Sequence, residues 1–142
     1  MEIKPYLRKA HYHETDQMGV IHHANFIRWF EEARVDFLTQ AGYGYEQSIK
    51  QGVDFAVTGV SCEYKSMVRF ADTVSITLSI AEVTRVRMAV CYEVRNAATG
   101  VLCATGTSSH CYVDSAAKRP VSLQKTVPDL YALLREYAGP DA

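Results

Sequence analysis

Two segments of this chain have an apolar residue at every second position, and this pattern limits the folds that the chain can adopt. In DTVSITLSI (72–80), every second residue from Val74 to Ile80 is aliphatic, and the residues between them are serine or threonine. In RVRMAVCYEVR (85–95), every second residue from Val86 to Val94 is apolar. Period two is the side-chain repeat of a β-strand with one buried face, which is typical of antiparallel sheets. The sequence therefore predicts an antiparallel sheet that is covered on one face.

A single long helix is predicted ahead of these strands, over ANFIRWFEEARVDFLTQAG (24–42). Its apolar residues recur at spacings of three and four, which places them on one helix face. They are Phe26, Phe30, Ala33, Phe37 and Ala41, widened by Ile27, Trp29 and Leu38. This much aromatic surface predicts a helix that is mostly buried.

The remaining segments complete an order of strand, helix, four strands and short helix. Strands are expected over 3–12, 53–65 and 101–114, a C-terminal helix over 127–138, and a short helix or loop over 43–52. One helix cannot cover a flat sheet of five strands. We therefore expect an α+β fold in which an antiparallel sheet of about five strands wraps around a long central helix. Pairing with a second copy would protect the edges of such a sheet, giving a homodimer or homotetramer.

The composition is that of a soluble globular protein, and we expect a single domain over residues 1–142. Hydrophobic residues make up 48% and charged residues 22% of the chain, and the formal net charge is −1. Nothing in this balance favours binding to nucleic acid or to an anionic membrane, so we expect neither partner.

Several residues of the predicted strands are expected to be structural. The four cysteines form no C-x-x-C pair, and we expect buried free thiols at Cys62, Cys91, Cys103 and Cys111. His110 is expected to be a hydrogen-bonded core or interface residue. No apolar targeting segment opens the chain, and unpaired cysteines suit a reducing compartment, so we expect a cytoplasmic protein.

One stretch, HETDQMGVIHHANF (13–26), gathers two carboxylates, three histidines, a glycine and an asparagine just before the predicted helix. Such polar density is typical of a solvated loop or of a site. An aspartate before a helix is most often an N-cap, and Asn25 or a residue just before it could also cap this helix. Alternatively, the Asp16 carboxylate could be a general base or a nucleophile, with free N–H groups of the first helical turn as donors to an oxyanion.

The pattern D-x-x-G-V-I-x-H-A-N-F, followed by I-R-W-F-E-E-A-R, resembles the hotdog-fold acyl-CoA thioesterases of the 4-hydroxybenzoyl-CoA thioesterase type. YKSMVRFADTVSI (64–76) is similar to the second landmark of that family, and the expected order of elements agrees over nearly the whole chain. The chain departs from the family pattern at His22 or His23, where many members have tyrosine, and at Ala71, where many have glycine.

The resemblance implies an enzyme that hydrolyses an aliphatic or aryl acyl-CoA to the free acid and CoA, with no cofactor and no metal. It implies Asp16 as the general base or nucleophile, and the backbone N–H of His23 as the oxyanion donor. Gly19 would let the loop turn sharply and approach the substrate. The other residues expected to bind the substrate are His22, Asn25, Tyr64, Lys65 and Arg69.

The two ends of an acyl-CoA need different surroundings. Phosphates need cations, and six basic residues near strand ends could supply them, although each alone is more often a surface charge: Lys65, Arg69, Arg85, Arg87, Lys118 and Arg119. An acyl pocket is expected between the central helix and the partner subunit. Aromatic residues that could line it, most of them plain core, are Phe26, Trp29, Phe30, Phe55 and Tyr64. The sequence does not choose the acyl group, or between CoA and acyl carrier protein.

Other carboxylates leave alternatives open. Glu14 is either an exposed charge at a strand end or a second carboxylate that disfavours ionisation of Asp16. Some hotdog enzymes use a helix carboxylate as the base, which makes Glu31 an alternative. More often such carboxylates pair with arginines of the same helix, here Glu31 and Glu32 with Arg28 or Arg34.

The histidines permit a metal hypothesis. His11 and His13 would share one face of a strand, and with His22, His23 and Asp16 they could bind zinc. Adjacent histidines rarely bind one ion together and no cysteine joins them, so hydrogen bonding around the carboxylate is favoured. Two other functions stay open, a hotdog hydratase or dehydratase and a non-catalytic acyl-CoA-binding module.

Overall fold

The computed structural model describes residues 2–139, so the expected domain limits at residues 1 and 142 lie outside the described residues. The elements follow in the order β1 (Tyr6–Lys9), the short 3-10 turn η1 (Tyr12–Glu14), α1 (Ala24–Gln40), α2 (Tyr45–Gln51), β2 (Val53–Tyr64), β3 (Thr73–Val83), β4 (Arg87–Asn96), β5 (Leu102–Asp114), α3 (Leu123–Thr126) and α4 (Pro128–Ala138). None of the helices in this part of the chain is long and apolar enough to cross a membrane.

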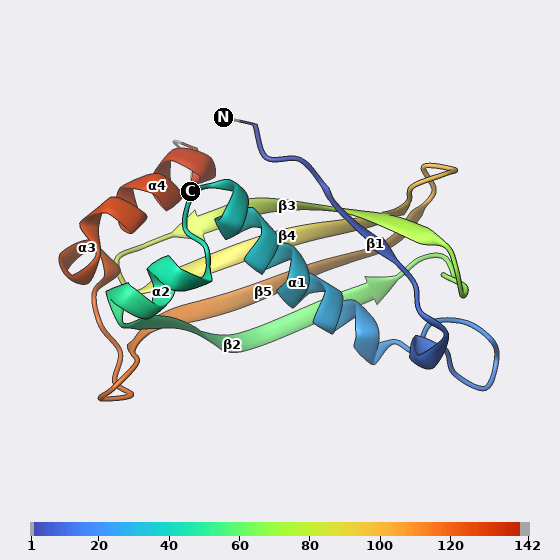
Figure 1. Cartoon of the computed structure of the whole chain (residues 1–142), viewed down its shortest axis with the longest axis horizontal. Coiled ribbons are helices and arrows are strands. Elements are labelled where there is room, and N and C mark those ends of the chain that lie inside the picture. Colours follow the sequence, from blue (N-terminus) through green and yellow to red (C-terminus); the bar gives the residue numbers. More distant parts are fainter. Residues whose placement is uncertain (1, 140–142) are drawn as a thin grey trace.

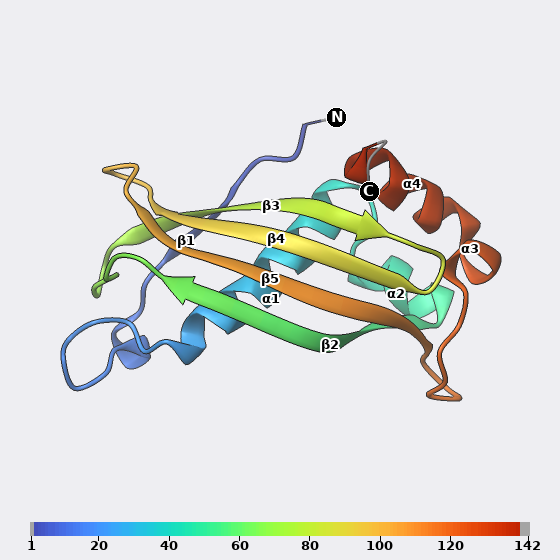
Figure 2. The same ribbon diagram turned by 180° about the vertical axis from the view of Figure 1, so that it is seen from behind.

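The five strands form one antiparallel sheet in the order β1-β3-β4-β5-β2. Helix α1 crosses one face of the sheet, and α4 covers the same side near the far end of β3 (Figure 1). Seen from behind, the long strands β2 to β5 lie in front and no described helix covers them (Figure 2). The expected α+β architecture, a sheet of five strands around one central helix, is confirmed.

The aromatic face of α1 forms the centre of the core. Trp29 and Phe30 are fully buried, and the Phe30 ring stacks on Tyr92 of β4 with 4.2 Å between ring centroids. The sheet makes room for this ring at Gly106 of β5, where a Cβ atom would lie 2.5 Å from the Phe30 ring and 2.9 Å from the Ser61 carbonyl oxygen. Close approach of helix and sheet therefore requires glycine at this position.

The alternation predicted for the central strands is largely correct, except that the predicted set of the second segment begins one member too early. In β4 the apolar set from Met88 to Val94 is buried, whereas Val86 precedes the strand and is exposed. In β3 a bulge between Ile80 and Glu82 shifts the register by one residue. Val83 is therefore buried, where unbroken alternation would have buried Glu82. The four cysteines are free as expected, although only Cys103 is fully buried.

The N-terminal strand is shorter than the predicted 3–12. Strand β1 ends at Lys9, and the chain turns into η1 because the Glu14 carboxylate accepts a hydrogen bond from the His11 N–H at 2.8 Å. Since His11 and His13 then lie in and beside a 3-10 turn, the prediction that they share one face of a strand is wrong.

The two edges of the sheet differ strongly. Strand β1 presents four residues at one edge, whereas β2 presents twelve residues at the other, and no described strand pairs with its outer side. Val57 and Val60 of β2 are exposed, as are Ile27 and Val35 on the neighbouring surface of α1. A long edge strand flanked by exposed apolar side chains is a surface that pairs readily with another strand.

His110 of β5 is buried as expected, with 1% of its surface exposed, but it is only half hydrogen-bonded. Its Nε2 atom bonds to Ser108 Oγ at 2.7 Å, whereas Nδ1 has no partner among the described residues. Burial, and next the positive charge of Arg34, lower the pKa of His110 to about 4. The imidazole is therefore neutral at pH 7.

Ala71 has a φ angle of 71°, in the left-handed region that favours glycine. We expect Ala71→Gly to raise the free energy of unfolding by about 0.5–1 kcal/mol, because relief of backbone strain exceeds the added entropy of the unfolded chain. Urea denaturation measures the change. Ala98→Gly is the matched control, because Ala98 lies in a turn and its φ angle is not positive. This variant should lower the free energy of unfolding. Equal effects of the two variants would contradict the claim that the Ala71 backbone is strained.

Candidate active site

The loop between η1 and α1 carries the residues that the sequence singled out. Thr15 and Ile21 form an isolated β-bridge at its base, and the Asp16 N–H donates to the Val20 carbonyl oxygen at 2.8 Å. Gly19 closes the loop with a φ of 78°, as its predicted role in a sharp turn requires. Asp16 is eight residues from the start of α1, not directly before it, and the closed loop returns the chain to the helix start.

Asp16 and the start of α1 line the same hollow. This hollow has a volume of about 380 Å³ and lies between the loop, the first turn of α1 and the segment that follows β2. Its lining is largely apolar and consists of Asp16, Met18, Val20, Ile21, His23, Phe26, Tyr64, Lys65, Ser66, Met67 and Val68. The fold therefore brings together Asp16, His23, Tyr64 and Lys65 of the predicted site.

The Asp16 carboxylate is half-buried, and only one of its two oxygens accepts a hydrogen bond within the described residues. Its Oδ1 atom accepts a hydrogen bond from the Met18 N–H at 2.8 Å, which closes the turn. Its Oδ2 atom accepts no hydrogen bond from any described residue. One oxygen thus holds the carboxylate in place, while the other is available to a ligand in the hollow. The expected N-cap of the helix is not formed by Asp16.

The start of α1 also has an N–H group without a partner in the described chain, at His23, which is one of the residues that line the same hollow. The Ala24 N–H is taken by His22 Nδ1 at 3.1 Å, and the Asn25 N–H by the His22 carbonyl oxygen. The His23 N–H donates to no described residue. Tyr64 fixes the His23 peptide from the other side, because its hydroxyl donates to the His23 carbonyl oxygen at 2.9 Å.

Tyr64 remains a donor over the whole neutral range. Partial burial, and next its contact with Cys62, raise the pKa of the Tyr64 hydroxyl to about 12. The ring also contacts Phe26 edge-to-face, with 5.2 Å between centroids. Tyr64 therefore links the end of β2 to the first turn of α1.

The other predicted binding residues lie differently. His22 is exposed and serves the helix start through its Nδ1 atom. Asn25 is buried and neither caps the helix nor contacts Asp16; its Nδ2 atom donates to the Glu14 carbonyl oxygen at 3.0 Å. Arg69 forms a bridge with Val20 through the backbone, next to the hollow but outside its lining.

The remaining cations expected to bind phosphate are far from Asp16 within one chain. Tyr64, beside Lys65, is in register with Ala104 of β5, whereas Arg87 is in register with Cys111. Seven residues of strand correspond to about 23 Å. Arg85, Lys118 and Arg119 lie at the same distant end as Arg87, so the six cations do not form one cluster.

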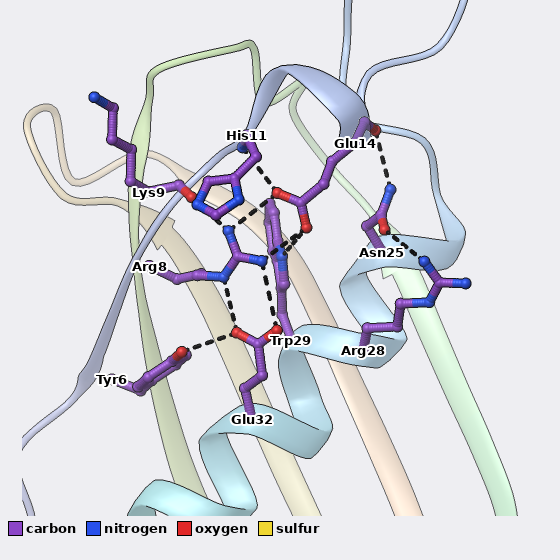
Figure 3. Close-up of polar contacts among 9 residues, drawn as sticks. All are labelled: Tyr6, Arg8, Lys9, His11, Glu14, Asn25, Arg28, Trp29 and Glu32. Atoms are coloured by element: carbon purple, nitrogen blue, oxygen red, sulfur yellow. Dashed lines mark hydrogen bonds and ion pairs between the residues drawn. The ribbon is translucent and has the colours of Figure 1, made fainter.

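Glu14 is buried, with 4% of its surface exposed, so the prediction of an exposed charge is wrong. Its carboxylate accepts hydrogen bonds from Arg8 Nη1 and Nη2 at 3.0 and 2.9 Å and from Trp29 Nε1 at 3.0 Å (Figure 3). Together with the His11 N–H, these donors occupy both oxygens. The carboxylate thus faces Arg8 and Trp29, forms no hydrogen bond with Asp16, and joins β1, η1 and α1.

Burial alone would raise the pKa of Glu14, but hydrogen bonds from His11 and Trp29 and the charge of Arg8 together hold it below its ordinary value. Arg8 also binds Glu32 of α1 at 2.8 Å, and Tyr6 donates to the same carboxylate. The predicted pairing of Glu32 with Arg28 or Arg34 is therefore wrong, because the strand arginine takes its place.

The histidines do not gather into a metal site. The His11 and His13 rings lie 5.3 Å apart, and the His22 and His23 rings stack at 4.1 Å. Within residues 2–139, no three side chains of histidine, cysteine, aspartate or glutamate are placed to hold a metal ion.

Several residues of the hollow were not predicted from the sequence. Met18 and Met67 are strongly exposed and face the hollow from the loop and from the segment after β2, with Ser66 beside them. A methionine inside the polar motif and another just after a strand were signals that a flexible apolar wall lies there. Conversely, Trp29 and Phe30 are core residues, and Phe55 lines a different hollow.

A curled antiparallel sheet wrapped around one long helix is the hotdog architecture, and in this chain it brings Asp16 and the start of α1 to one hollow. The chain belongs to the thioesterase-like superfamily, whose sequence pattern matches residues 10–132. The expected family is thereby confirmed.

Known relatives are similar over most of their length. The chain is 31% identical to YneP of Bacillus subtilis, provisionally named an acyl-CoA thioesterase, over 85% of this chain and 87% of that protein. It is 24% identical to the acyl-CoA thioester hydrolase YbgC of Escherichia coli, over 84% and 88%. The solved structure of a DHNA-CoA thioesterase from Staphylococcus aureus superposes with a TM-score of 0.86 at 31% identity, covering 92% and 87% of the chains.

We expect Glu14→Gln to lower the free energy of unfolding at pH 7 by about 3 kcal/mol, because Arg8 loses a buried charged partner. The folded pKa of Glu14 lies below its ordinary value of 4.5, so its stabilising contribution is present above that pH and is lost as the pH falls further. Urea denaturation at pH 7 and at about pH 3 measures both effects, and the gap between wild type and variant should close in acid.

Glu93→Gln is the matched control, because Glu93 pairs with Arg95 on the surface. It should change stability by less than about 0.5 kcal/mol. If Glu14→Gln changes the free energy of unfolding at pH 7 as little as Glu93→Gln does, the buried pair of Arg8 and Glu14 does not stabilise the fold.

Proposed function

We propose that this protein is an acyl-CoA thioesterase that hydrolyses an acyl-CoA to a free acid and CoA. The observation that carries the proposal is that Asp16 and His23 line one hollow and that each has a polar group with no partner among the described residues, Asp16 Oδ2 and the His23 N–H. The activity named for the relatives in Bacillus subtilis, Escherichia coli and Staphylococcus aureus supports it.

In the proposed reaction, the thioester carbonyl lies between these two atoms. Asp16 takes a proton from a water molecule, and the water oxygen attacks the carbonyl carbon. The carbonyl oxygen becomes an oxyanion that accepts a hydrogen bond from the His23 N–H, with the positive end of the α1 dipole behind it. The carbon–sulfur bond then breaks, and the proton held by Asp16 passes to the departing thiolate.

Direct attack by Asp16 on the carbonyl carbon is the other route open to the same carboxylate. It would expel the thiolate of CoA and leave a mixed anhydride, which water then hydrolyses to regenerate Asp16. Both routes need the free Oδ2 atom and the same oxyanion donor, so both predict the same dependence on Asp16 and His23.

The remaining residues of the predicted site have proposed roles in binding. Tyr64 positions the oxyanion donor through the His23 carbonyl oxygen, and Gly19 shapes the loop that carries Asp16. Lys65 and Arg69, at the rim of the hollow, would meet the phosphates of CoA. Four free cysteines suit a reducing compartment, and we place the enzyme in the cytoplasm.

We also propose that the working unit contains a homodimer built through β2. Antiparallel pairing of two β2 edges about a two-fold axis would continue the sheet and leave both α1 helices on the same face. It would cover the exposed apolar side chains of that surface, which are Ile27, Val35, Val57 and Val60. With the axis near the middle of the strand, Tyr64 of one copy lies beside Asp54 of the other, so each catalytic hollow is completed by the second copy.

We expect Asp16→Asn to lower kcat/KM for thioester hydrolysis by about a thousandfold, because an amide is neither a base nor a nucleophile. The fold should be unchanged, since the Asn Oδ1 atom can still accept the Met18 N–H. Thiol release from acetyl-, octanoyl-, benzoyl- and 1,4-dihydroxy-2-naphthoyl-CoA measures the activity.

Asp114→Asn is the matched control, because Asp114 accepts turn N–H groups from Ala116 and Ala117 at the other end of the sheet. It should retain wild-type turnover. Near-normal hydrolysis by Asp16→Asn would exclude Asp16 as the reacting group, and hydration of crotonyl-CoA without thiol release would favour a hydratase instead.

For the dimer, we expect Val60→Lys to produce a monomer with at least about tenfold lower turnover, because two lysines would lie close together across the two-fold axis. Val60 is 42% exposed in the single chain, so its substitution should leave the subunit folded. Leu7→Lys on the opposite edge strand β1, where Leu7 is 63% exposed, is the control and should remain a dimer. Sedimentation equilibrium measures the oligomeric state. A Val60→Lys monomer with normal activity would contradict the proposal that the second copy completes each catalytic hollow.

A further inference from the structure

A second hollow lies beneath the C-terminal half of α1, apart from the one that contains Asp16. Its volume is about 330 Å³, and α1, β2, β3, β4 and α4 all contribute to its lining. Most of its side chains are apolar, as represented by Leu38, Phe55, Val57 and Leu78. A hollow of this kind can hold a small organic group.

Arg34 is the cation of this hollow, and it has no carboxylate partner among the described residues. Only its Nη1 atom is engaged, in a 2.8 Å hydrogen bond to the Tyr92 hydroxyl, although a guanidinium has five N–H donors. Arg8, by contrast, binds two carboxylates. The hollow also has two carboxylates, Glu31 and Asp54, but both side chains are exposed and neither pairs with Arg34.

A buried chain of hydrogen bonds holds the Arg34 guanidinium in position. The Tyr92 hydroxyl that accepts from Arg34 bonds to Ser108 Oγ at 2.6 Å, and Ser108 bonds to His110 Nε2. The Tyr92 ring cannot swing away because it stacks on Phe30. None of the groups beyond Arg34 in this chain is a carboxylate, so the chain positions the guanidinium without pairing its charge.

The proposed dimer brings this hollow to the reacting carboxylate of the other copy. Asp54, Phe55 and Val57 of β2 line the Arg34 hollow, whereas Tyr64 at the opposite end of β2 lines the Asp16 hollow. Antiparallel pairing of the two β2 strands therefore sets the Arg34 hollow of one copy beside the Asp16 hollow of the other. An acyl group whose thioester lies at Asp16 would extend into the partner's second hollow.

We propose that Arg34 is a specificity-determining residue that selects acyl groups ending in a carboxylate, the substrates being CoA monothioesters of dicarboxylic acids. The inference rests on the proposed thioesterase activity and its dimer. A guanidinium with free N–H donors in an apolar, half-buried hollow favours a planar carboxylate, which it can bind through two parallel hydrogen bonds. A methyl group at the same position would leave these donors without partners.

The test compares matched substrates on the intact enzyme. The pairs are adipoyl-CoA against hexanoyl-CoA, and 4-carboxybenzoyl-CoA against 4-methylbenzoyl-CoA, with kcat and KM measured for each. Wild type should favour the carboxylated member of at least one pair by about tenfold or more in kcat/KM. Arg34→Met should lower kcat/KM for that member by about 100-fold and change its uncharged counterpart by less than about threefold.

Two further variants keep the test decisive if Arg34→Met folds poorly. Arg34→Lys retains the positive charge but cannot form two parallel hydrogen bonds to one carboxylate. This variant should keep part of the preference for the carboxylated substrate. Tyr92→Phe keeps the stacked ring and removes the anchor of the guanidinium, so it should raise KM for the carboxylated substrate with kcat unchanged. Arg95→Met, which removes an exposed cation paired with Glu93, is the control and should behave as wild type.

The outcomes separate this inference from the proposed function. If wild type hydrolyses both members of each pair equally well, or if Arg34→Met and Arg34→Lys slow them equally, Arg34 does not select a carboxylate while the thioesterase assignment stands. If wild type hydrolyses none of the four substrates and none of the acyl-CoAs tested for Asp16, the proposed function itself fails.

Discussion

Burial of the aromatic face of α1 against a single curled sheet is the constraint on which the rest of this structure depends. One helix of seventeen residues must cover the inner face of five strands, so the sheet bends around it and Phe30 sits directly on Gly106. The helix start then meets the Asp16 loop, while its C-terminal half leaves a hollow above β2. The same geometry leaves the long β2 edge unpaired within the described chain, and this edge is the one at which we propose that a second copy pairs.

Two carboxylates that are two residues apart serve opposite purposes because of what surrounds them. Glu14 is buried and engaged on both oxygens by Arg8, Trp29 and the His11 N–H, so its charge is compensated and its conformation is fixed. Asp16 is half-exposed and uses only one oxygen, for the turn to Met18. The contacts of Glu14 fix the start of the segment that carries Asp16, and a fixed segment of this kind is what the proposed role of Asp16 would need.

Arg34 illustrates how a competing partner changes an expected contact. Spacing along α1 favours a pair with Glu31, three residues away, yet Glu31 is exposed and forms no ion pair with Arg34 within the described residues. Glu32 is bound by Arg8 from β1. Arg34 instead donates to Tyr92, and its charge stays inside an apolar hollow. A charged pair on a helix surface contributes only a few tenths of a kcal/mol, so a buried alternative readily displaces it.

The sequence by itself determined the alternating strands, the amphipathic helix and the motif around Asp16, because each depends on spacing between residues that are near one another in the chain. The order of elements followed from them, and so did the hotdog family. Only the tertiary structure decided that Glu14 is buried, that Asn25 ties η1 to α1, and that the cations near β4 lie far from Asp16. These facts depend on partners brought together from distant segments, since burial and charge compensation are properties of the packed chain and leave no local pattern.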